Sequence, residues 1–207
     1  IEVTPANNGG GGGGGGGNGP LLTAGPDRTL QCTAPISPVQ LQGAIFFTPT
    51  MPLTYTWTGP FGTAFGLTPT VGLPLGANPL TFTISDGVRS ASDGVVIRLE
   101  DTVAPAIASA AASPSVLWPP NHKMVPVTVT VSAADRCDAS VMCSIVSVTS
   151  NEGSPADYEI TGPLTMRLRS ERLGTGAGRV YTAAVMCADA SGNTSRTSVD
   201  IVVPHNQ

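Results

Sequence analysis

The sequence predicts an all-β chain of two tandem β-sandwich domains, preceded by a glycine-rich N-terminal tail with a short strand. Its 207 residues are enough for two small domains. Apolar residues come in short runs separated by Pro and Gly, and no stretch keeps a helical period for long enough to predict a helix. The pattern of runs restarts after the segment 101–105. We therefore expect a tail over residues 1–20, a first sandwich over 21–101 and a second over 102–207.

The tail begins with a segment that resembles an isolated strand. Ile1, Glu2, Val3 and Thr4 alternate apolar and polar side chains, and the uninterrupted glycines Gly9–Gly17 behave as a flexible linker. A short strand on a tether can add to the open sheet edge of another subunit. Repeated head to tail, such a contact does not close and produces a filament.

Eleven strands are predicted after the tail. The runs in the first sandwich are 28–32, 39–47, 53–58, 80–84 and 95–99. The runs in the second sandwich are 107–112, 125–132, 142–149, 164–169, 179–187 and 198–203. Short strands at this close spacing are typical of sandwiches.

Charge is scarce and unevenly placed. Charged residues make up 12% of the chain, about half the usual fraction, and no Asp, Glu, Lys or Arg occurs from Thr29 to Ser85. The ten Lys and Arg residues are scattered, which argues against nucleic-acid binding, and no apolar run is long enough to span a membrane. Because soluble proteins guard sheet edges with charge, we expect the first domain, which has almost no charge, to be an interface covered by protein or by sugar.

The cysteines predict disulfides and an extracellular location. Cys32, Cys137, Cys143 and Cys187 have no CxxC spacing, and two His residues are too few to complete a typical zinc site. If the strands alternate in direction, Cys143 begins the third strand of the second sandwich and Cys187 ends the sixth, so we favour that pair. An interdomain bridge from Cys32 to Cys137 is then feasible, and a Cys137–Cys143 bridge is the open alternative. Because the chain starts with Ile, we expect a removed secretory signal or a fragment.

Acidic and amide side chains are predicted to meet at one end of the second sandwich. They come from the segment leading into this domain and from its second-to-third and sixth-to-seventh strand loops: Glu100, Asp101, Asp135, Asp138, Asp189 and Asn193. Oxygen ligands from several loops suit Ca²⁺, which would stiffen the domain joint. The alternative interpretation is that these residues are ordinary turn formers.

The sequence does not predict an enzyme. Gly174–Gly178 lies between two predicted strands, so a hairpin turn is favoured over a phosphate-binding loop. His122 has no neighbouring nucleophile or second metal ligand in the sequence. Aromatic side chains could stack on sugar rings, with Trp118 and Tyr158 as candidates, whereas core packing is favoured for Trp57.

Two sets of motifs resemble known families. The segments 24–29, 53–57 and 80–87 look like the PKD-type immunoglobulin-like repeat of bacterial surface proteins, although Asp-Phe-Gly-Asp-Gly does not follow Trp57. The segments 117–123, 150–152, 167–179 and 187–193 resemble a second immunoglobulin-like repeat, akin to HYR modules. The resemblance implies two immunoglobulin-like domains and extracellular spacers, adhesive modules or fibre-forming subunits, with no catalysis.

Two functions follow from these observations. The first is a secreted structural subunit that binds copies of itself through residues 1–4 and the uncharged domain, forming a filament or surface layer. The alternative is an adhesive or carbohydrate-binding spacer of a larger cell-surface protein, with glycans as partners.

Overall fold

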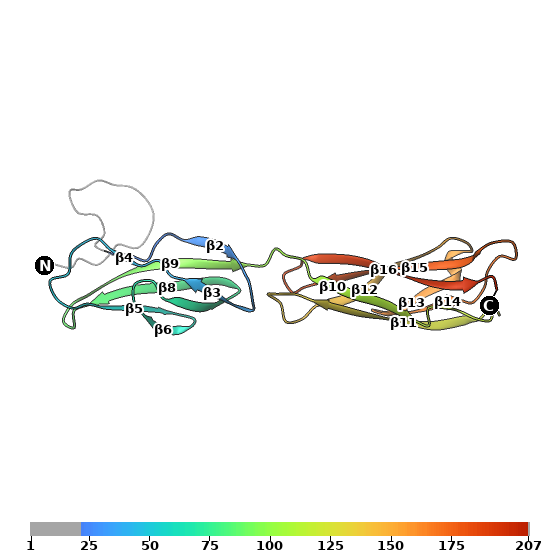
Figure 1. Ribbon diagram of the computed structural model, residues 1–207, viewed down its shortest axis with the longest axis horizontal. Helices are drawn as coiled ribbons and strands as arrows, with labels where there is room; N and C mark the ends of the chain where they lie inside the picture. Colours follow the sequence, from blue (N-terminus) through green and yellow to red (C-terminus); the bar gives the residue numbers. More distant parts are fainter. Residues whose placement is uncertain (1–21, 207) are drawn as a thin grey trace. The chain divides into compact units, whose positions relative to one another are not determined.

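A computed structural model describes residues 22–206, which divide after Asp101 into two compact units (Figure 1). Each unit is a β-sandwich, as the sequence predicts. The expected assembly strand, Ile1–Thr4, and the glycine run lie outside the described residues. Within the described part of the chain, no helix is long and apolar enough to span a membrane.

The first domain contains nine strands in two layers. They are β1 (Leu22–Thr23), β2 (Arg28–Gln31), β3 (Ile36–Gln40), β4 (Ala44–Ile45), β5 (Thr54–Gly59), β6 (Gly62–Phe65), β7 (Thr70–Pro74), β8 (Gly76–Ser85) and β9 (Ser90–Glu100). One layer is a five-stranded sheet in the order β2-β9-β8-β5-β6, with β2 parallel to β9. The other layer is formed by the ribbons β1-β4 and β3-β7. The sequence missed β1, β6 and β7, which are only two, four and five residues long; β7 buries Val71 and Leu73, but Gly72 and Pro74 interrupt its apolar pattern.

The expected continuous strand 39–47 is instead two strands, β3 and β4, separated by residues 41–43. The backbone N–H of Leu41 donates to Pro69 O and that of Gly43 donates to Leu67 O, so this segment is still bonded to the residues that precede β7. A Cβ at Gly43 would lie 2.6 Å from Leu67 O, and glycine therefore permits this close approach.

Trp57 anchors the core of the first domain. Its ring stacks on Phe82 with 4.8 Å between the ring centroids, and both side chains are fully buried. The indole Nε1 donates to Leu67 O at 3.2 Å, which satisfies its buried polar atom. A buried Trp on this strand is also typical of immunoglobulin-like sandwiches.

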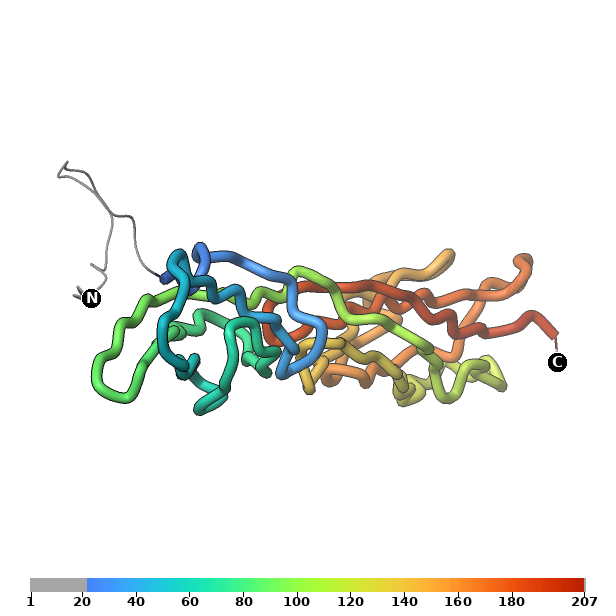
Figure 2. The backbone as a smooth tube through the Cα atoms, turned by 60° about the vertical axis from the view of Figure 1, so that its left-hand side comes forward, coloured from blue at the N-terminus to red at the C-terminus, as the bar shows by residue number. Residues whose placement is uncertain are grey.

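The second domain has seven strands. They are β10 (Ala106–Ser113), β11 (Met124–Ala134), β12 (Met142–Ser150), β13 (Tyr158–Gly162), β14 (Thr165–Arg169), β15 (Gly178–Ala188) and β16 (Thr194–Pro204). The two sheets have the orders β10-β11-β14-β13 and β12-β15-β16. In the second sheet β15 and β16 run side by side over eleven residue pairs (Figure 2). This division of four and three strands is the arrangement of a constant-type immunoglobulin domain.

All six strands expected in the second domain are present, and β13 is an additional one. A 3₁₀ turn, η1 (Pro155–Asp157), precedes β13 and is capped by Ser154, whose Oγ accepts from the N–H of Ala156. The prediction of a hairpin turn at Gly174–Gly178 is wrong. This segment joins β14 to β15, which belong to different sheets, so it is a connection between the layers.

Candidate functional site

The acidic residues of the second domain lie in the two loops where the sequence places them. Asp135 and Asp138 follow β11, and Asp189 and Asn193 flank the turn between β15 and β16. The loops meet, because Asp138 Oδ2 accepts from both the N–H and the Oγ of Ser191, at 3.1 and 3.2 Å. Carboxylate oxygens of Asp138 and Asp189 lie within 4.8 Å of each other.

These side chains also organise their own loops. Asp135 Oδ1 accepts from the N–H groups of Cys137 and Asp138 at 2.7 and 3.1 Å. Asp189 Oδ1 accepts from the backbone N–H of Asn193 at 2.8 Å, and its Oδ2 accepts from the Asn193 side chain at 3.0 Å. Asp135 and Asp189 therefore do act as turn formers. A Ca²⁺ ion would bind through the remaining lone pairs of the Asp138 and Asp189 carboxylates.

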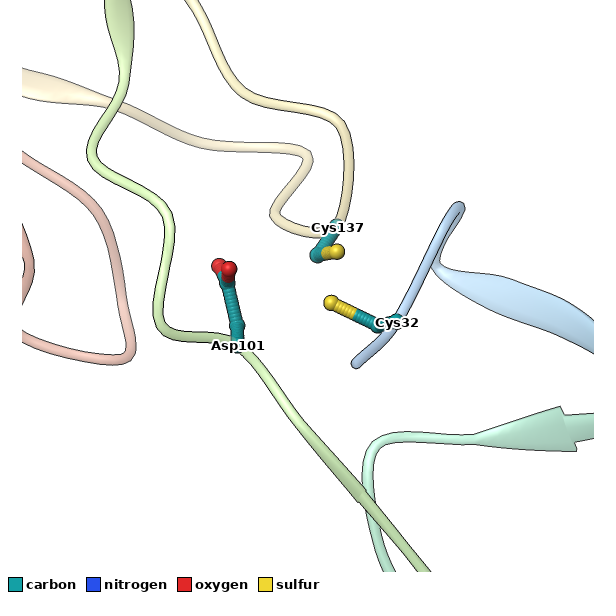
Figure 3. A group of neighbouring side chains, drawn as sticks. All are labelled: Cys32, Asp101 and Cys137. Atoms are coloured by element: carbon teal, nitrogen blue, oxygen red, sulfur yellow. The ribbon is translucent and has the colours of Figure 1, made fainter. Parts of the chain in front are cut away.

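Glu100 and Asp101, the other two expected ligands, belong to the first domain. Glu100 is the last residue of β9, and its carbonyl accepts from the N–H of Cys32 at 2.9 Å. Asp101 follows directly, and its Oδ1 accepts from Gln31 Nε2 at 3.3 Å. Both residues thus lie at the end of the domain where β2 and β9 finish; Figure 3 shows the side chain of Asp101.

The disulfide Cys143–Cys187 joins neighbouring strands of one sheet. The two residues face each other directly in the β12–β15 ladder, with their Cα atoms 4.0 Å apart. Cys32 lies just after β2 and Cys137 lies in the loop after β11 (Figure 3). Each of them is also disulfide-bonded. With Cys143 bonded to Cys187, the alternative Cys137–Cys143 bridge is wrong. The pairing of Cys32 with Cys137 stays a prediction from the sequence.

A buried polar cluster that the sequence did not reveal lies at the other end of the second domain. Arg179 donates from Nη1 to Asp157 Oδ2 at 3.1 Å and to Tyr181 OH at 2.7 Å. Tyr181 OH in turn donates toward Arg169 O at 2.9 Å. Arg169 Nε donates to Asp157 Oδ1 at 2.8 Å, so one carboxylate joins two guanidinium groups. A Tyr early in this strand, bonded back to the preceding corner, is a feature of immunoglobulin-like sandwiches.

The cluster shifts the pKa values of its members. The hydrogen bond from the backbone N–H of Ser154 lowers the pKa of Asp157. Burial opposes this shift, and the hydrogen bond between Arg169 and the Asp157 carboxylate adds to it. Burial raises the pKa of Tyr181. Burial lowers the pKa of Arg179, but its contacts with Tyr181 and Asp157 outweigh burial, so the net shift is upward. At neutral pH the cluster is therefore an ion pair with a neutral phenol, a stabilising arrangement.

The outer face of the five-stranded sheet carries a regular array of neutral side chains. We define this hydroxyl face by eight of the outward residues of β5, β6, β8 and β9: Thr54, Thr56, Thr58, Thr63, Phe65, Thr81, Thr83 and Ser92. The charged residues Arg98 and Glu100 lie on the same side of β9, closer to its end. The hydroxyls stand opposite one another across the strands, because Thr56 pairs with Thr83 and Thr58 with Thr81. Thr63 extends the second row and Ser92 the first. Neighbouring members of a row are about 4.8 Å apart, the distance between strands, and the two rows are about 6.8 Å apart along the strands.

The residues considered for sugar stacking differ in accessibility. Trp57 is fully buried and cannot contact a sugar. Trp118 is 45% exposed, whereas Tyr158 packs against the core of the second domain. The exposed aromatic ring of the hydroxyl face is Phe65, at 74% exposure.

The histidines make structural contacts. His122 Nδ1 lies 3.3 Å from Glu171 Oε2, and its backbone N–H and carbonyl bond to Ser170 and Arg169. His205 Nε2 lies 3.0 Å from Gly174 O. In the described part of the chain, these contacts give neither imidazole a nucleophile to activate.

No protein-family model matches the chain, and no curated protein matches it. Among solved structures, the chain is similar to human protocadherin-24 EC1-2, at 18% identity and a TM-score of 0.38, over 87% of this chain and 95% of that one. It is also similar to the titin domains z1z2 in complex with telethonin, at 11% identity and a TM-score of 0.37, over 88% and 94%. Sidekick-1 immunoglobulin domains 1–4 match at 9% identity and a TM-score of 0.39, over 84% of this chain and 46% of that one. Matches this weak carry no argument about function, and the assignment of two immunoglobulin-like sandwiches is supported by strand order.

Proposed function

We propose that the chain is a non-catalytic adhesive module of an extracellular protein, and that its first domain binds neutral, hydroxyl-rich polymers such as polysaccharides. The observation that carries this proposal is the hydroxyl face. Its paired rows present donors and acceptors without charge, as Thr56 and Thr58 face Thr83 and Thr81. A hydroxyl both donates and accepts, so such a surface can match the hydroxyls of a sugar polymer in many registers.

The absence of charge on this face favours a neutral partner. Burying an ionised side chain against an uncharged polymer would cost several kcal/mol of desolvation free energy. Burying a hydroxyl that is left without a partner costs less, of order 1–3 kcal/mol. None of the eight residues of the hydroxyl face carries charge, and the nearest charged residues on that side of β9, Arg98 and Glu100, lie at the end of the strand. The exposed ring of Phe65, at one edge, adds an apolar platform of the kind that stacks on sugar rings.

The second domain has the properties of a stable carrier. Its disulfide Cys143–Cys187 requires an oxidising compartment, which supports an extracellular location. Its buried Asp157–Arg179 cluster and its loop carboxylates have structural partners. Catalysis is not proposed, because the titratable groups described above stabilise the fold.

Filament formation through Ile1–Thr4 stays a prediction from the sequence, because those residues lie outside the described part of the chain. Deleting residues 1–8 and comparing micrographs of the two purified proteins tests it separately. Filaments that are lost on deletion would support the strand's role, and filaments that persist would refute it.

Retention on immobilised polysaccharides tests the adhesive function. We expect the full chain to bind at least one neutral polysaccharide, and to stay bound when NaCl is raised to about 1 M, because salt screens charge contacts and leaves hydrogen bonding and apolar packing largely intact. Thr58→Glu should release the protein, whereas the matched change Thr149→Glu in the second domain should not. Binding only to acidic polysaccharides, with loss in salt, would contradict the proposal.

A further inference from the structure

The first domain has an apolar groove at the end opposite Asp101, outside the hydroxyl face. Its volume is about 550 Å³, and its apolar lining includes Phe47, Pro49, Met51, Leu53, Ile84 and Val88. The lining residues come from the segment between β4 and β5 and from the ends of β8 and β9 with the turn that joins them. Figure 1 shows the course of these backbone segments. This volume is in the range of pockets that enclose whole ligands, so it has room for the side chains of a protein turn.

Beside the groove, the β8–β9 turn presents Val88 to solvent at 91% exposure. The turn is firmly built. Asp86 Oδ1 accepts from the N–H groups of Val88 and Arg89 at 2.8 and 2.7 Å, and Ser85 Oγ accepts from the N–H of Gly87 at 3.1 Å. Gly87, at φ +91°, takes the left-handed conformation that the turn requires. These bonds hold Val88 at the rim of the groove, where its apolar side chain lines one wall and projects into water.

A projecting apolar turn and an apolar groove on one surface are complementary to the same surface of another copy. The geometry points to a two-fold contact between the first domains of two chains, in which the β8–β9 turn of each copy, with Val88 at its tip, enters the groove of the other. Such an isologous arrangement uses the same patch twice and closes on itself. This self-association surface is distinct from the hydroxyl face, and the inference does not depend on the proposed function.

The charges around the groove fit this arrangement. The lining includes one acid, Asp86, and one base, Arg89. The two side chains attract each other within their own turn, so the patch has no net charge and suits an uncharged or self-complementary surface, such as the same patch of another copy, better than a partner of one charge sign. The patch is small, so the dimer is expected to be weak and reversible.

Sedimentation of the full chain over about 1 µM to 1 mM measures this association. We expect a reversible monomer–dimer equilibrium. Val88→Asp and Met51→Asp should each lower the association constant at least tenfold, because each buries a carboxylate in the apolar contact. Phe65→Asp is the matched control, since Phe65 is also exposed but lies on the hydroxyl face, and it should leave the equilibrium unchanged. Val88 is nearly fully exposed, so Val88→Asp should also keep the thermal unfolding midpoint of the parent.

Three results would overturn the inference. One is a chain that stays monomeric over the whole concentration range. Another is a dimer that persists with Val88→Asp and Met51→Asp. The third is a dimer that disappears on deletion of residues 1–8 while the groove variants have no effect, which would assign the contact to the N-terminal segment. Retention on polysaccharides tests the hydroxyl face, which is a different surface. A failure of dimer formation can therefore be distinguished from a failure of the adhesive function.

Discussion

Asp157 and Arg179 form an ion pair in the second domain, with Arg179 Nη1 3.1 Å from Asp157 Oδ2 and side-chain exposures of 13% and 3%. The acid comes from the η1 turn and the base from the start of β15, so the pair fixes the turn to the sandwich. Tyr181 OH completes the contact, accepting from Arg179 and donating toward Arg169 O. A buried guanidinium held in this way is stabilising only while its carboxylate stays ionised.

The stability of the second domain should therefore fall in acid. The pKa of Asp157 is lowered in the folded state, first by the N–H of Ser154. A lowered folded-state pKa contributes stability that is present above the unfolded pKa of about 3.9 and is lost as the pH falls through the folded value. We expect the free energy of unfolding, followed by the fluorescence of Trp118, to decrease below about pH 4. A profile that is flat from pH 5 to pH 2 would contradict this role.

Replacing the acid should reproduce the loss at neutral pH. Asp157→Asn leaves Arg179 buried without a counter-charge, which should cost about 3–5 kcal/mol of unfolding free energy in the second domain. Asp200→Asn, at an exposed acid of the same domain, is the control and should cost less than about 1 kcal/mol. Urea unfolding at pH 7 measures both. Equal effects of the two substitutions would show that the ion pair contributes little.

Gly153 should be intolerant of a side chain. It has φ +92°, and a Cβ there would collide with Arg179 Nη2 and Asp157 Oδ2. Gly192 offers a matched control, since it has φ +89° with nothing within 4 Å of the same position. Gly192→Ala should cost about 1–2 kcal/mol from backbone strain alone. Gly153→Ala should cost at least about 3 kcal/mol, because it also separates the ion pair, and similar values for the two would contradict the packing described.

The Cys143–Cys187 disulfide should stabilise the second domain specifically. It closes a loop with a sequence separation of 44, for which loop-closure entropy predicts about 4 kcal/mol. Cys143→Ala with Cys187→Ala should lower the unfolding free energy of the second domain by about that amount and leave the transition reported by Trp57 unchanged. Non-reducing peptide mapping of the parent should link these two cysteines. A linked Cys32–Cys137 peptide would confirm the pairing predicted from the sequence, and free thiols there would contradict it.

Calcium binding is predicted to stabilise the second domain through Asp138 and Asp189. Added Ca²⁺ at a hundred times its dissociation constant should contribute about 2.7 kcal/mol to the unfolding free energy. Asp138→Asn should abolish the effect, whereas Asp200→Asn should not. A melting temperature that is indifferent to both Ca²⁺ and chelator would leave these carboxylates with their turn-forming role alone.

The sequence predicted the fold well where strands are long and apolar. Each run expected in the second domain corresponds to a strand, and alternating strand direction was enough to place Cys143 opposite Cys187. Two of the missed strands, β6 and β13, share a cause. β6 and β13 are edge strands of four and five residues that pair on one side only, so little of their apolar surface is buried and the hydrophobic pattern is weak.

The functional surfaces were harder to predict from the sequence than the fold. The Tyr181 cluster unites residues up to 24 positions apart, and no local spacing marks it. The hydroxyl face did have a signal, because Thr alternates with Tyr55 and Trp57 along β5, but its extent depends on strand pairing. The groove could not be predicted, since it depends on how the segment between β4 and β5 packs beside the turn at Val88.

Removal of the hydroxyls alone tests the adhesive role of the first domain most directly. The test variant replaces four threonines of the hydroxyl face by Val, which keeps the side-chain shape and the strand preference but removes the hydroxyls: Thr56, Thr58, Thr81 and Thr83. The control variant replaces four threonines of the second domain by Val: Thr128, Thr130, Thr149 and Thr165. Each lost hydrogen bond is worth about 0.5–1.5 kcal/mol, so retention on the polysaccharide that binds the parent should fall at least tenfold in the first variant and stay unchanged in the control. Retention that survives in the first variant, or is lost equally in both, would contradict the account.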